Sequence, residues 1–296
     1  MSGLDLLVVG DVNADIVLRG GDLVPAFGQR EQLVDHAELV LGGSGAIVAA
    51  GAARLGLRVA MAGCVGDDAL GRAMLDALEG VDVRAVRTVT QPTGVSVGLA
   101  RADDRAVLTA LGALASLRAE DVPASMLAEA RHVHVASPFL QPGLDLAAIA
   151  SRATGTTSLD PGWDPHERWE LAWEGFDVLL PNAQEARRLT GGGGDVEAAA
   201  RSLAASGPLV VVKLGAEGAL AAGGGGLVRA RAPQVDPVDA TGAGDSFDAG
   251  FFAARLAGEG LADALALGCA CGALSTRAAG GTAGQPTLAE ARSFRR

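Results

Sequence analysis

Residues 239–250 (DATGAGDSFDAG) combine glycine with a carboxylate in a way that suits phosphate chemistry. Gly242 and Gly244 allow the backbone to bend so that several N–H groups point the same way. The segment runs into a helical apolar pattern, so these groups would lie at a helix N-terminus, which favours an anion. Asp245 could then accept a proton from a hydroxyl that attacks the phosphate. The alternative is a glycine-rich turn in which Asp245 only caps the helix.

Two shorter polar elements each have a structural and a chemical interpretation. In the sequence PNAQE, Asn182 could cap a helix and Glu185 could complete a capping box. Asn13 and Asp15 follow a short apolar strand, where a polar turn is the simplest interpretation. A carboxylate such as Asp15 could also accept hydrogen bonds from two adjacent hydroxyls of a sugar.

The elements that must position these residues alternate between strand and helix. Buried strands are predicted at 4–10, 57–63, 131–136, 156–160, 176–181 and 208–215, and helices at 44–55, 143–154, 182–190, 195–206, 242–257 and 261–278. This order predicts a mostly parallel sheet with helices on both faces. Residues 14–41 and 93–110 instead alternate apolar and polar side chains, which predicts a small exposed β flap. We expect one α/β domain over residues 1–296 that carries this flap as a lid.

The composition excludes several classes of protein. The 296 residues carry 24 Lys+Arg against 35 Asp+Glu, and a formal charge of −11 argues against nucleic-acid binding. The chain shows no apolar stretch of membrane-spanning length, no signal-peptide pattern and no disulfide framework, so we expect a cytoplasmic protein without a membrane partner. Lys213 is the only lysine and follows an apolar strand rather than a glycine loop, which excludes a P-loop kinase.

The segment around Asp245 resembles the second signature of the ribokinase/PfkB family of carbohydrate and nucleoside kinases, D-x-T-G-A-G-D-x-F. The matching residues are Asp239, Thr241, Gly242, Ala243, Gly244, Asp245 and Phe247. The resemblance implies a ribokinase-like three-layer αβα domain with a β-sheet lid, and an ATP-dependent kinase that phosphorylates a hydroxyl of a small sugar. It implies that Asp245 is the catalytic base, that residues 242–244 form the anion hole, and that Asp239 and Thr241 help to hold a monovalent cation, usually K⁺.

Other landmarks follow in the order of the family and extend the resemblance over the whole chain. They imply acceptor binding by Asn13, Asp15, Gly42 and Gly43, and ordering of Mg²⁺ through water by Asn182 and Glu185. They place Lys213, Gly215 and Gly268 on the nucleotide side, although many members have asparagine or histidine where this chain has Gly268.

One departure concerns the acceptor. Ile47 stands where the family's first signature has an asparagine, and an apolar side chain cannot donate that hydrogen bond to the sugar. A nucleoside kinase or a non-catalytic ligand-binding relative are therefore the alternatives to a sugar kinase. The chain has no tyrosine, so it offers few platforms for stacking a base, which favours a sugar. Whether the acceptor is already phosphorylated stays open, and many relatives pair their lids, so a homodimer is plausible.

Overall fold

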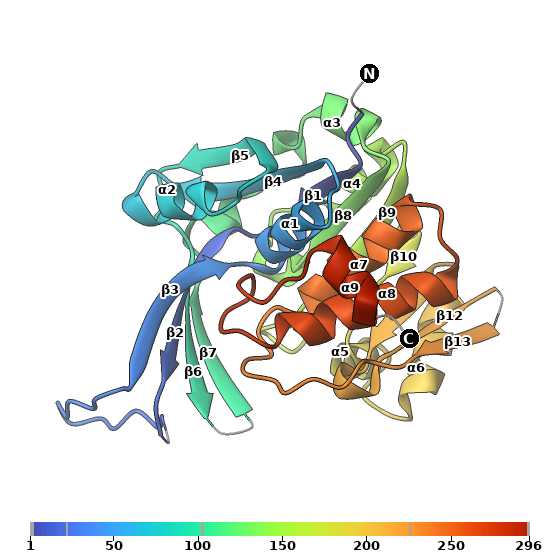
Figure 1. The fold of residues 1–296 in the computed structure, drawn as a ribbon. Helices are drawn as coiled ribbons and strands as arrows, with labels where there is room; N and C mark the ends of the chain where they lie inside the picture. Colours follow the sequence, from blue (N-terminus) through green and yellow to red (C-terminus); the bar gives the residue numbers. More distant parts are fainter. Residues whose placement is uncertain (1–2, 22, 102–103, 225, 295–296) are drawn as a thin grey trace.

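The structure is a computed structural model that describes residues 3–21, 23–101, 104–224 and 226–294. Figure 1 shows a large α/β body and a small sheet that projects from one side of it. The strands of the large sheet lie in the order β13-β12-β11-β10-β9-β8-β1-β4-β5. Their bounds are β1 Leu6–Val9, β4 Val59–Gly66, β5 Val81–Val89, β8 His132–Ala136, β9 Thr156–Asp160, β10 Val178–Leu179, β11 Leu209–Lys213, β12 Ala219–Gly223 and β13 Gly226–Ala230.

The large sheet is mostly parallel. Every neighbouring pair from β5 to β11 is parallel, and only β12 and β13 run antiparallel at the edge. Parallel strands are buried on both faces, and β1 accordingly consists of four buried apolar residues. Leu6 and Val8 face one hydrophobic core, whereas Leu7 and Val9 face the other.

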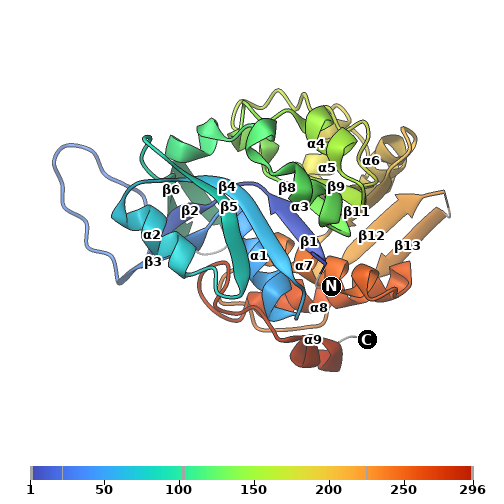
Figure 2. The same ribbon diagram turned by 90° about the horizontal axis from the view of Figure 1, so that it is seen from above.

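Helices cover both faces of the sheet, as the view from above in Figure 2 shows. One layer contains α1 Ser44–Arg54, α2 Ala69–Asp76, α7 Ala243–Leu256, α8 Leu261–Ser275 and α9 Leu288–Phe294. The other contains α3 Ala124–Glu129, α4 Leu146–Arg152, α5 Ala183–Leu189 and α6 Val196–Ala204. Short 3₁₀ turns lie at Gly112–Ser116, Ala119–Asp121, Pro138–Leu140 and Gly215–Glu217. The predicted three-layer fold is confirmed, and none of the described helices is both long and apolar enough to cross a membrane.

The small sheet has the strand order β3-β2-β6-β7. Its strands are β2 Asn13–Arg19, β3 His36–Gly42, β6 Val95–Arg101 and β7 Asp104–Ala110. β2 pairs antiparallel with β3 and parallel with β6, so the two stretches predicted to form the flap do build one sheet. We call this sheet and the loop between β2 and β3 the lid. Its closure over a substrate, and the division of residues 1–296 into one domain with this lid, stay predictions.

One predicted strand is much shorter than expected. The segment 176–181 forms only β10, Val178–Leu179. Single hydrogen bonds continue beyond it, since the N–H of Leu180 donates to the carbonyl of Leu159 at 2.9 Å and the carbonyl of Pro181 accepts from the N–H of Lys213 at 3.0 Å. Pro181 has no N–H to donate, so the ladder is incomplete there. The chain turns at this point, and Asn182 then begins the next helix.

Candidate active site

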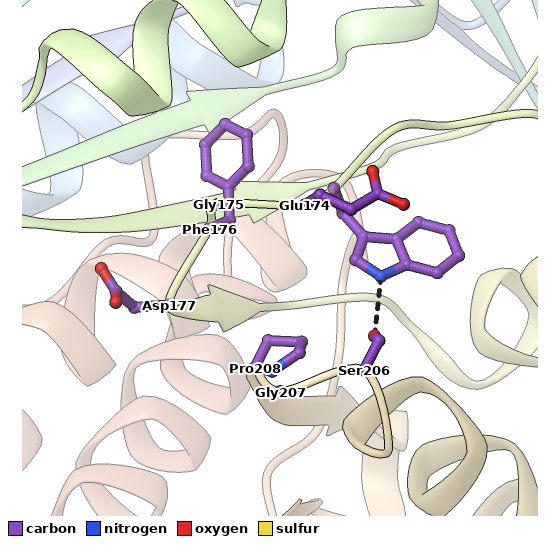
Figure 3. A pocket seen from close by; sticks show the side chains of 8 residues that line it. Glu174, Gly175, Phe176, Asp177, Ser206, Gly207 and Pro208 are labelled. Carbon is purple, nitrogen blue, oxygen red and sulfur yellow. Dashed lines mark hydrogen bonds between the residues drawn. The ribbon is translucent and has the colours of Figure 1, made fainter.

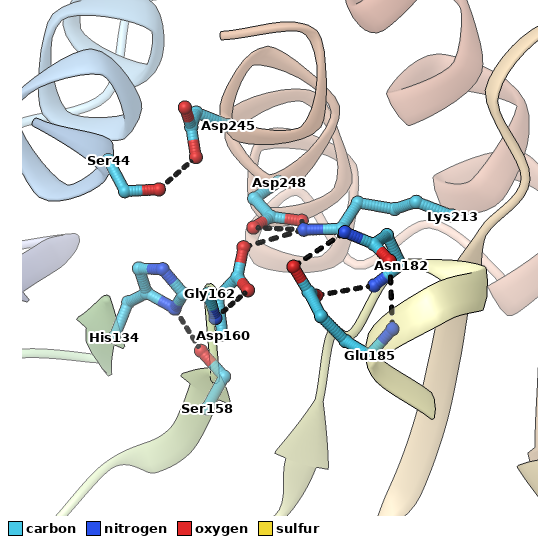
Figure 4. Close-up of polar contacts among 10 residues, drawn as sticks. All are labelled: Ser44, His134, Ser158, Asp160, Gly162, Asn182, Glu185, Lys213, Asp245 and Asp248. Carbon is cyan, nitrogen blue, oxygen red and sulfur yellow. Dashed lines mark hydrogen bonds and ion pairs between the residues drawn. The ribbon is translucent and has the colours of Figure 1, made fainter. Parts of the chain in front are cut away.

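Polar and charged side chains, among them the predicted site residues Asn182 and Lys213, gather at the carboxyl ends of the parallel strands. Asp160 ends β9, Asn182 follows β10, and Lys213 ends β11. Asp245 lies in the first turn of α7, close to this edge (Figure 4). Since carboxyl ends of parallel strands meet at one edge, residues distant in sequence converge where such sheets bind ligands.

The predicted anion-hole residues lie at the N-terminus of α7, and their role with a phosphate stays a prediction. Gly242 precedes the helix with φ 70°, in the left-handed region that glycine adopts without steric cost. A Cβ at Gly242 would also lie 2.7 Å from the Cα of Gly281. The N–H of Ala243 donates to the carbonyl of Ala240 at 3.2 Å, so the hole would depend on the next amides, those of Gly244 and Asp245.

The carboxylate of Asp245 contacts the first residue of α1. The hydroxyl of Ser44 donates a hydrogen bond to Oδ1 of Asp245 (Figure 4). Burial and the nearby charge of Asp160 raise the pKa of Asp245 to about 7, while the bond from Ser44 acts in the opposite direction. A carboxylate with a pKa near neutrality is well suited to accept and release a proton.

Asp11 was not singled out from the sequence, and it caps the N-terminus of α1. Its carboxylate accepts hydrogen bonds from the N–H groups of Ser44 at 3.1 Å and Gly45 at 2.9 Å. The N-terminus of α1 is thereby capped by the protein itself. Burial raises the pKa of Asp11 to about 6.

The four predicted acceptor-binding residues are in mutual contact. Asn13 Nδ2 donates to Asp15 Oδ1 at 2.7 Å and to Ser96 Oγ at 3.1 Å. A Cβ at Gly42 would lie 2.1 Å from Asp15 Oδ1, and one at Gly43 would lie 2.8 Å from Asn13 Oδ1. The two glycines are therefore needed for the backbone to approach these polar side chains. The structure brings this set together, while its role with a sugar stays a prediction.

Asn182 and Glu185 form the capping box that was the alternative interpretation. Asn182 Oδ1 accepts from the N–H of Glu185 at 3.0 Å, and Glu185 Oε2 accepts from the N–H of Asn182 at 2.8 Å. Burial and the charge of Asp160 raise the pKa of Glu185 to about 8. Carboxylate and amide oxygens suit Mg²⁺ held through water. Among the described residues, no group of three or more His, Cys, Asp or Glu side chains is placed to hold a metal ion directly.

Asp239 is already surrounded by donors. Its Oδ1 accepts from the N–H and the hydroxyl of Thr241 at 2.9 and 2.7 Å. Its Oδ2 accepts from the N–H of Gly280 at 2.9 Å and from Arg19 of the lid at 3.0 Å. In this arrangement the Asp239 carboxylate is not suited to bind K⁺ directly, because the guanidinium of Arg19 already donates to its Oδ2. The cation role of Asp239 and Thr241 stays a prediction.

The residues expected on the nucleotide side have distinct surroundings. The ammonium of Lys213 is buried and lies 2.6 Å from Asp160 and 3.2 Å from Asp248 (Figure 4). Gly215 has φ 62° and open space around it. Gly268 is buried in α8, where a Cβ would lie 2.8 Å from the ring of Phe247, so the packing itself requires glycine. The contact of Lys213, Gly215 and Gly268 with a nucleotide stays a prediction.

The sequence analysis did not single out Asp160 or Asp248, and it did not predict their contacts with Lys213. Two signals were available: Asp160 ends a predicted strand, and Asp248 follows Asp245 by one helical turn. Neither signal reveals a partner, because the contacts depend on how the strands and α7 pack.

Ile47, the departure from the family pattern, packs against the loop that precedes α7. It is buried, and its side chain packs against Gly281 and Gly242. Its carbonyl accepts a hydrogen bond from Gln285 Nε2 at 2.9 Å.

A cavity of about 230 Å³ lies elsewhere (Figure 3). It is bordered by Trp173, Asp177 and Ser206, at the amino ends of β10 and β11. Trp173 Nε1 donates to Ser206 Oγ at 3.1 Å. Since the predicted site residues occupy the carboxyl ends of the same strands, this cavity is separate from the candidate site.

The chain is similar to known proteins over nearly its whole length. The profile of the pfkB family of carbohydrate kinases matches residues 4–288. Ribokinase from Haemophilus influenzae is 30% identical over 307 residues, which cover 98% of this chain and 97% of that protein. ATP-dependent ribose-1-phosphate kinase from Halopiger xanaduensis is 34% identical over 280 residues, 91% of each chain. The structure of Arabidopsis thaliana ribokinase with ribose and ATP matches with a TM-score of 0.83 and 25% identity, over 100% of this chain and 99% of that one.

The mostly parallel sheet, the helices on both faces and the separate small sheet define the ribokinase fold. The chain belongs to the pfkB family of carbohydrate kinases. Membership makes it a phosphotransferase of the sugar- and nucleoside-kinase type.

Proposed function

We propose that the protein transfers the terminal phosphoryl group of ATP to a hydroxyl of a small sugar. The observation that carries the proposal is the position of Asp245, with a pKa near 7, in the first turn of a helix that begins at a left-handed glycine. As the acceptor oxygen bonds to phosphorus, the bond from phosphorus to the ADP oxygen breaks and the hydroxyl proton passes to Asp245. The N–H groups of the first turn of α7 stabilise the charge that develops on the phosphoryl oxygens.

The remaining residues bind and orient. Asn182 and Glu185 are proposed to hold Mg²⁺ through water at the ends of β10 and β11, where the ion would neutralise phosphate charge. Gly215 and Gly268 are proposed to lie on the nucleotide side, as is Lys213. The proposal implies a cytoplasmic enzyme, where ATP is available.

The acceptor is proposed to be a sugar. Asn13 and Asp15 offer an amide and a carboxylate side by side, which suits adjacent hydroxyls. The similar proteins named above are called ribokinase and ribose-1-phosphate kinase, and one was solved with ribose. A nucleoside acceptor remains the alternative, but none of the four acceptor residues is aromatic, so they offer no ring on which a base could stack.

A homodimer through the lid is part of the proposal. Most of the large hydrophobic side chains exposed among the described residues belong to the lid, and Phe27 is 96% exposed. They are Val24, Phe27, Leu33, Val34, Leu39, Val107 and Leu108. Apolar side chains concentrated on one part of a surface favour association. Light scattering of the purified chain tests this, and a monomer at all concentrations would refute the dimer.

The activity is tested by ADP release with ATP, Mg²⁺ and K⁺ against a panel of sugars, sugar phosphates and nucleosides. Turnover is expected with a sugar, and the Asp245→Ala variant should lose roughly 10³-fold in kcat. Asp76→Ala, an exposed carboxylate on α2, is the matched control and should retain full activity. Zero turnover with every acceptor would reject the kinase proposal.

A further inference from the structure

Three ionisable side chains are buried together beneath the first turn of α7 (Figure 4). Lys213 is 9% exposed, Asp160 is 4% exposed and Asp248 is fully buried. The Lys213 ammonium lies 2.6 Å from Asp160 Oδ2, and 3.3 and 3.2 Å from the two oxygens of Asp248. The other oxygen of Asp160 accepts from the N–H of Gly162 at 3.1 Å. An isolated buried charge is very costly, so a cluster of this kind persists only where its charges are balanced.

The choice of lysine here is unusual for this chain. Lys213 is the only lysine, whereas all other basic side chains are arginine. A compact ammonium can approach two carboxylates from one point, whereas a planar guanidinium is larger and requires a fork of acceptors. The site therefore favours the compact ammonium group of lysine over the larger guanidinium group of arginine.

The cluster is in contact with the predicted anion hole. A Cβ at Gly244 would lie 3.5 Å from Lys213 Nζ, so the ammonium lies directly against the first turn of α7. Asp248 belongs to the same helix, one turn after Asp245. Lys213 and its two partners thus join the ends of β9 and β11 to the helix that carries the proposed base.

We propose that Lys213 is a positioning residue, whose ammonium balances the charge of Asp160 and fixes the first turn of α7 so that Asp245 stays ready to accept a proton. This inference rests on the proposed kinase function. It gives Lys213 a role different from the contact with nucleotide expected from the sequence, since its ammonium already has two carboxylate partners.

The charges around Asp245 determine how the loss of Lys213 would change the pKa of Asp245. Burial raises the pKa of Asp248, whereas the charge of Lys213 lowers the pKa of Asp160 against the effect of its burial. The pKa of Lys213 is raised by both aspartates, so it stays charged. The titratable and charged groups that act on Asp245 come from the β1–β2 loop, β9, α5, β11 and α7 itself: Asp11, Asp160, Glu185, Lys213 and Asp248. Without Lys213 the charge of Asp160 is unbalanced, and the pKa of Asp245 must rise.

The experiment compares pH profiles of kcat for the full-length protein and its variants. Lys213→Met should move the acidic limb to higher pH by about one unit, because proton uptake by Asp245 becomes easier. The double variant Lys213→Met/Asp160→Asn removes both charges and should restore the wild-type limb. Asp76→Asn, which neutralises an exposed carboxylate on α2, is the matched control, and its acidic limb should not move.

The outcomes separate this inference from the proposed function. An inactive wild type rejects the kinase proposal, whereas an active wild type whose limb is unchanged in Lys213→Met rejects only the role of Lys213. If Lys213→Met does not fold, the double variant Lys213→Met/Asp160→Asn tests the proposed role of Lys213. A double variant that folds and has the acidic limb of the wild type supports charge balance. A double variant that does not fold, or whose acidic limb differs from that of the wild type, overturns it.

Discussion

The hydroxyl of Ser44 donates a hydrogen bond to the carboxylate of Asp245, and this bond joins the N-termini of α1 and α7. The two residues are 201 positions apart in the sequence. Ser44 directly follows Gly43, so the bond also links the expected acceptor-binding strand to the proposed base. The orientation and the proton affinity of Asp245 thus depend on a residue outside its own motif.

Ser44→Ala should alter the pH dependence of the reaction. The bond from Ser44 lowers the pKa of Asp245, which burial holds near 7, so its loss raises that pKa further. Asp245 accepts a proton only when ionised, so activity is lost as the pH falls through its pKa. The acidic limb of the kcat profile should move up by about one pH unit. Ser44→Thr keeps a hydroxyl and should resemble the wild type, and identical limbs in all three proteins would contradict this role.

Glu185→Gln should weaken the use of Mg²⁺ while preserving the fold. The amide oxygen can still accept from the N–H of Asn182, and the pKa of about 8 means that a neutral side chain is already tolerated here. We expect the Mg²⁺ concentration for half-maximal ADP release to rise about tenfold. Glu290→Gln changes the acceptor for Thr287 at the start of α9 and is the matched control. An unchanged Mg²⁺ titration would remove Glu185 from the metal site.

Arg19→Met should create a dependence on K⁺. Arg19 supplies a positive charge beside Asp239, with an Nη2–Oδ2 distance of 3.0 Å. Removing it leaves the carboxylate without its charged partner and open to a cation. Initial rates in KCl, NaCl and tetramethylammonium chloride at equal ionic strength should differ little for the wild type, and severalfold for the variant. Arg84→Met, an exposed arginine on β5, is the control. A wild type that requires K⁺ would show that the cation displaces Arg19.

Gly42→Ala should damage acceptor binding. The new Cβ would lie 2.1 Å from Asp15 Oδ1 and would displace that carboxylate. A misplacement of this size should lower kcat/KM for the sugar on the order of 10²-fold, with little effect on the KM for ATP. Gly98→Ala in β6 is the control, because its Cβ would meet only the carbonyl of Ile16 at 3.9 Å. Equal losses for both substrates would indicate misfolding of the lid rather than a local effect.

Most of the fold was predictable because its signals are local. The apolar run at β1 and the alternating pattern of β6 each reflect how one strand is buried, which the order of side chains specifies directly. The short β10 was harder to predict, since the apolar residues around it suggested a longer strand. Pro181, which lacks an N–H, was the signal in the sequence for an incomplete ladder.

The site was predictable only in part, for a related reason. The capping box of Asn182 and Glu185 and the left-handed Gly242 depend on neighbours in the sequence. The partners of Lys213 do not, because Asp160 lies 53 positions away and Asp248 lies 35. The guanidinium beside Asp239 likewise comes from the lid, 220 positions earlier.

The sequence by itself determined the alternation of strands and helices, the glycine-dependent start of α7 and the presence of a carboxylate in its first turn. These features follow from local backbone preferences and from the periodicity of apolar residues. The tertiary structure decided which charges meet at the carboxyl edge of the sheet, and how deeply each is buried. Electrostatic energies depend on distance and on exclusion of water, so the pKa near 7 of Asp245 and the balanced charge of Lys213 arise only when the strands and α7 pack together.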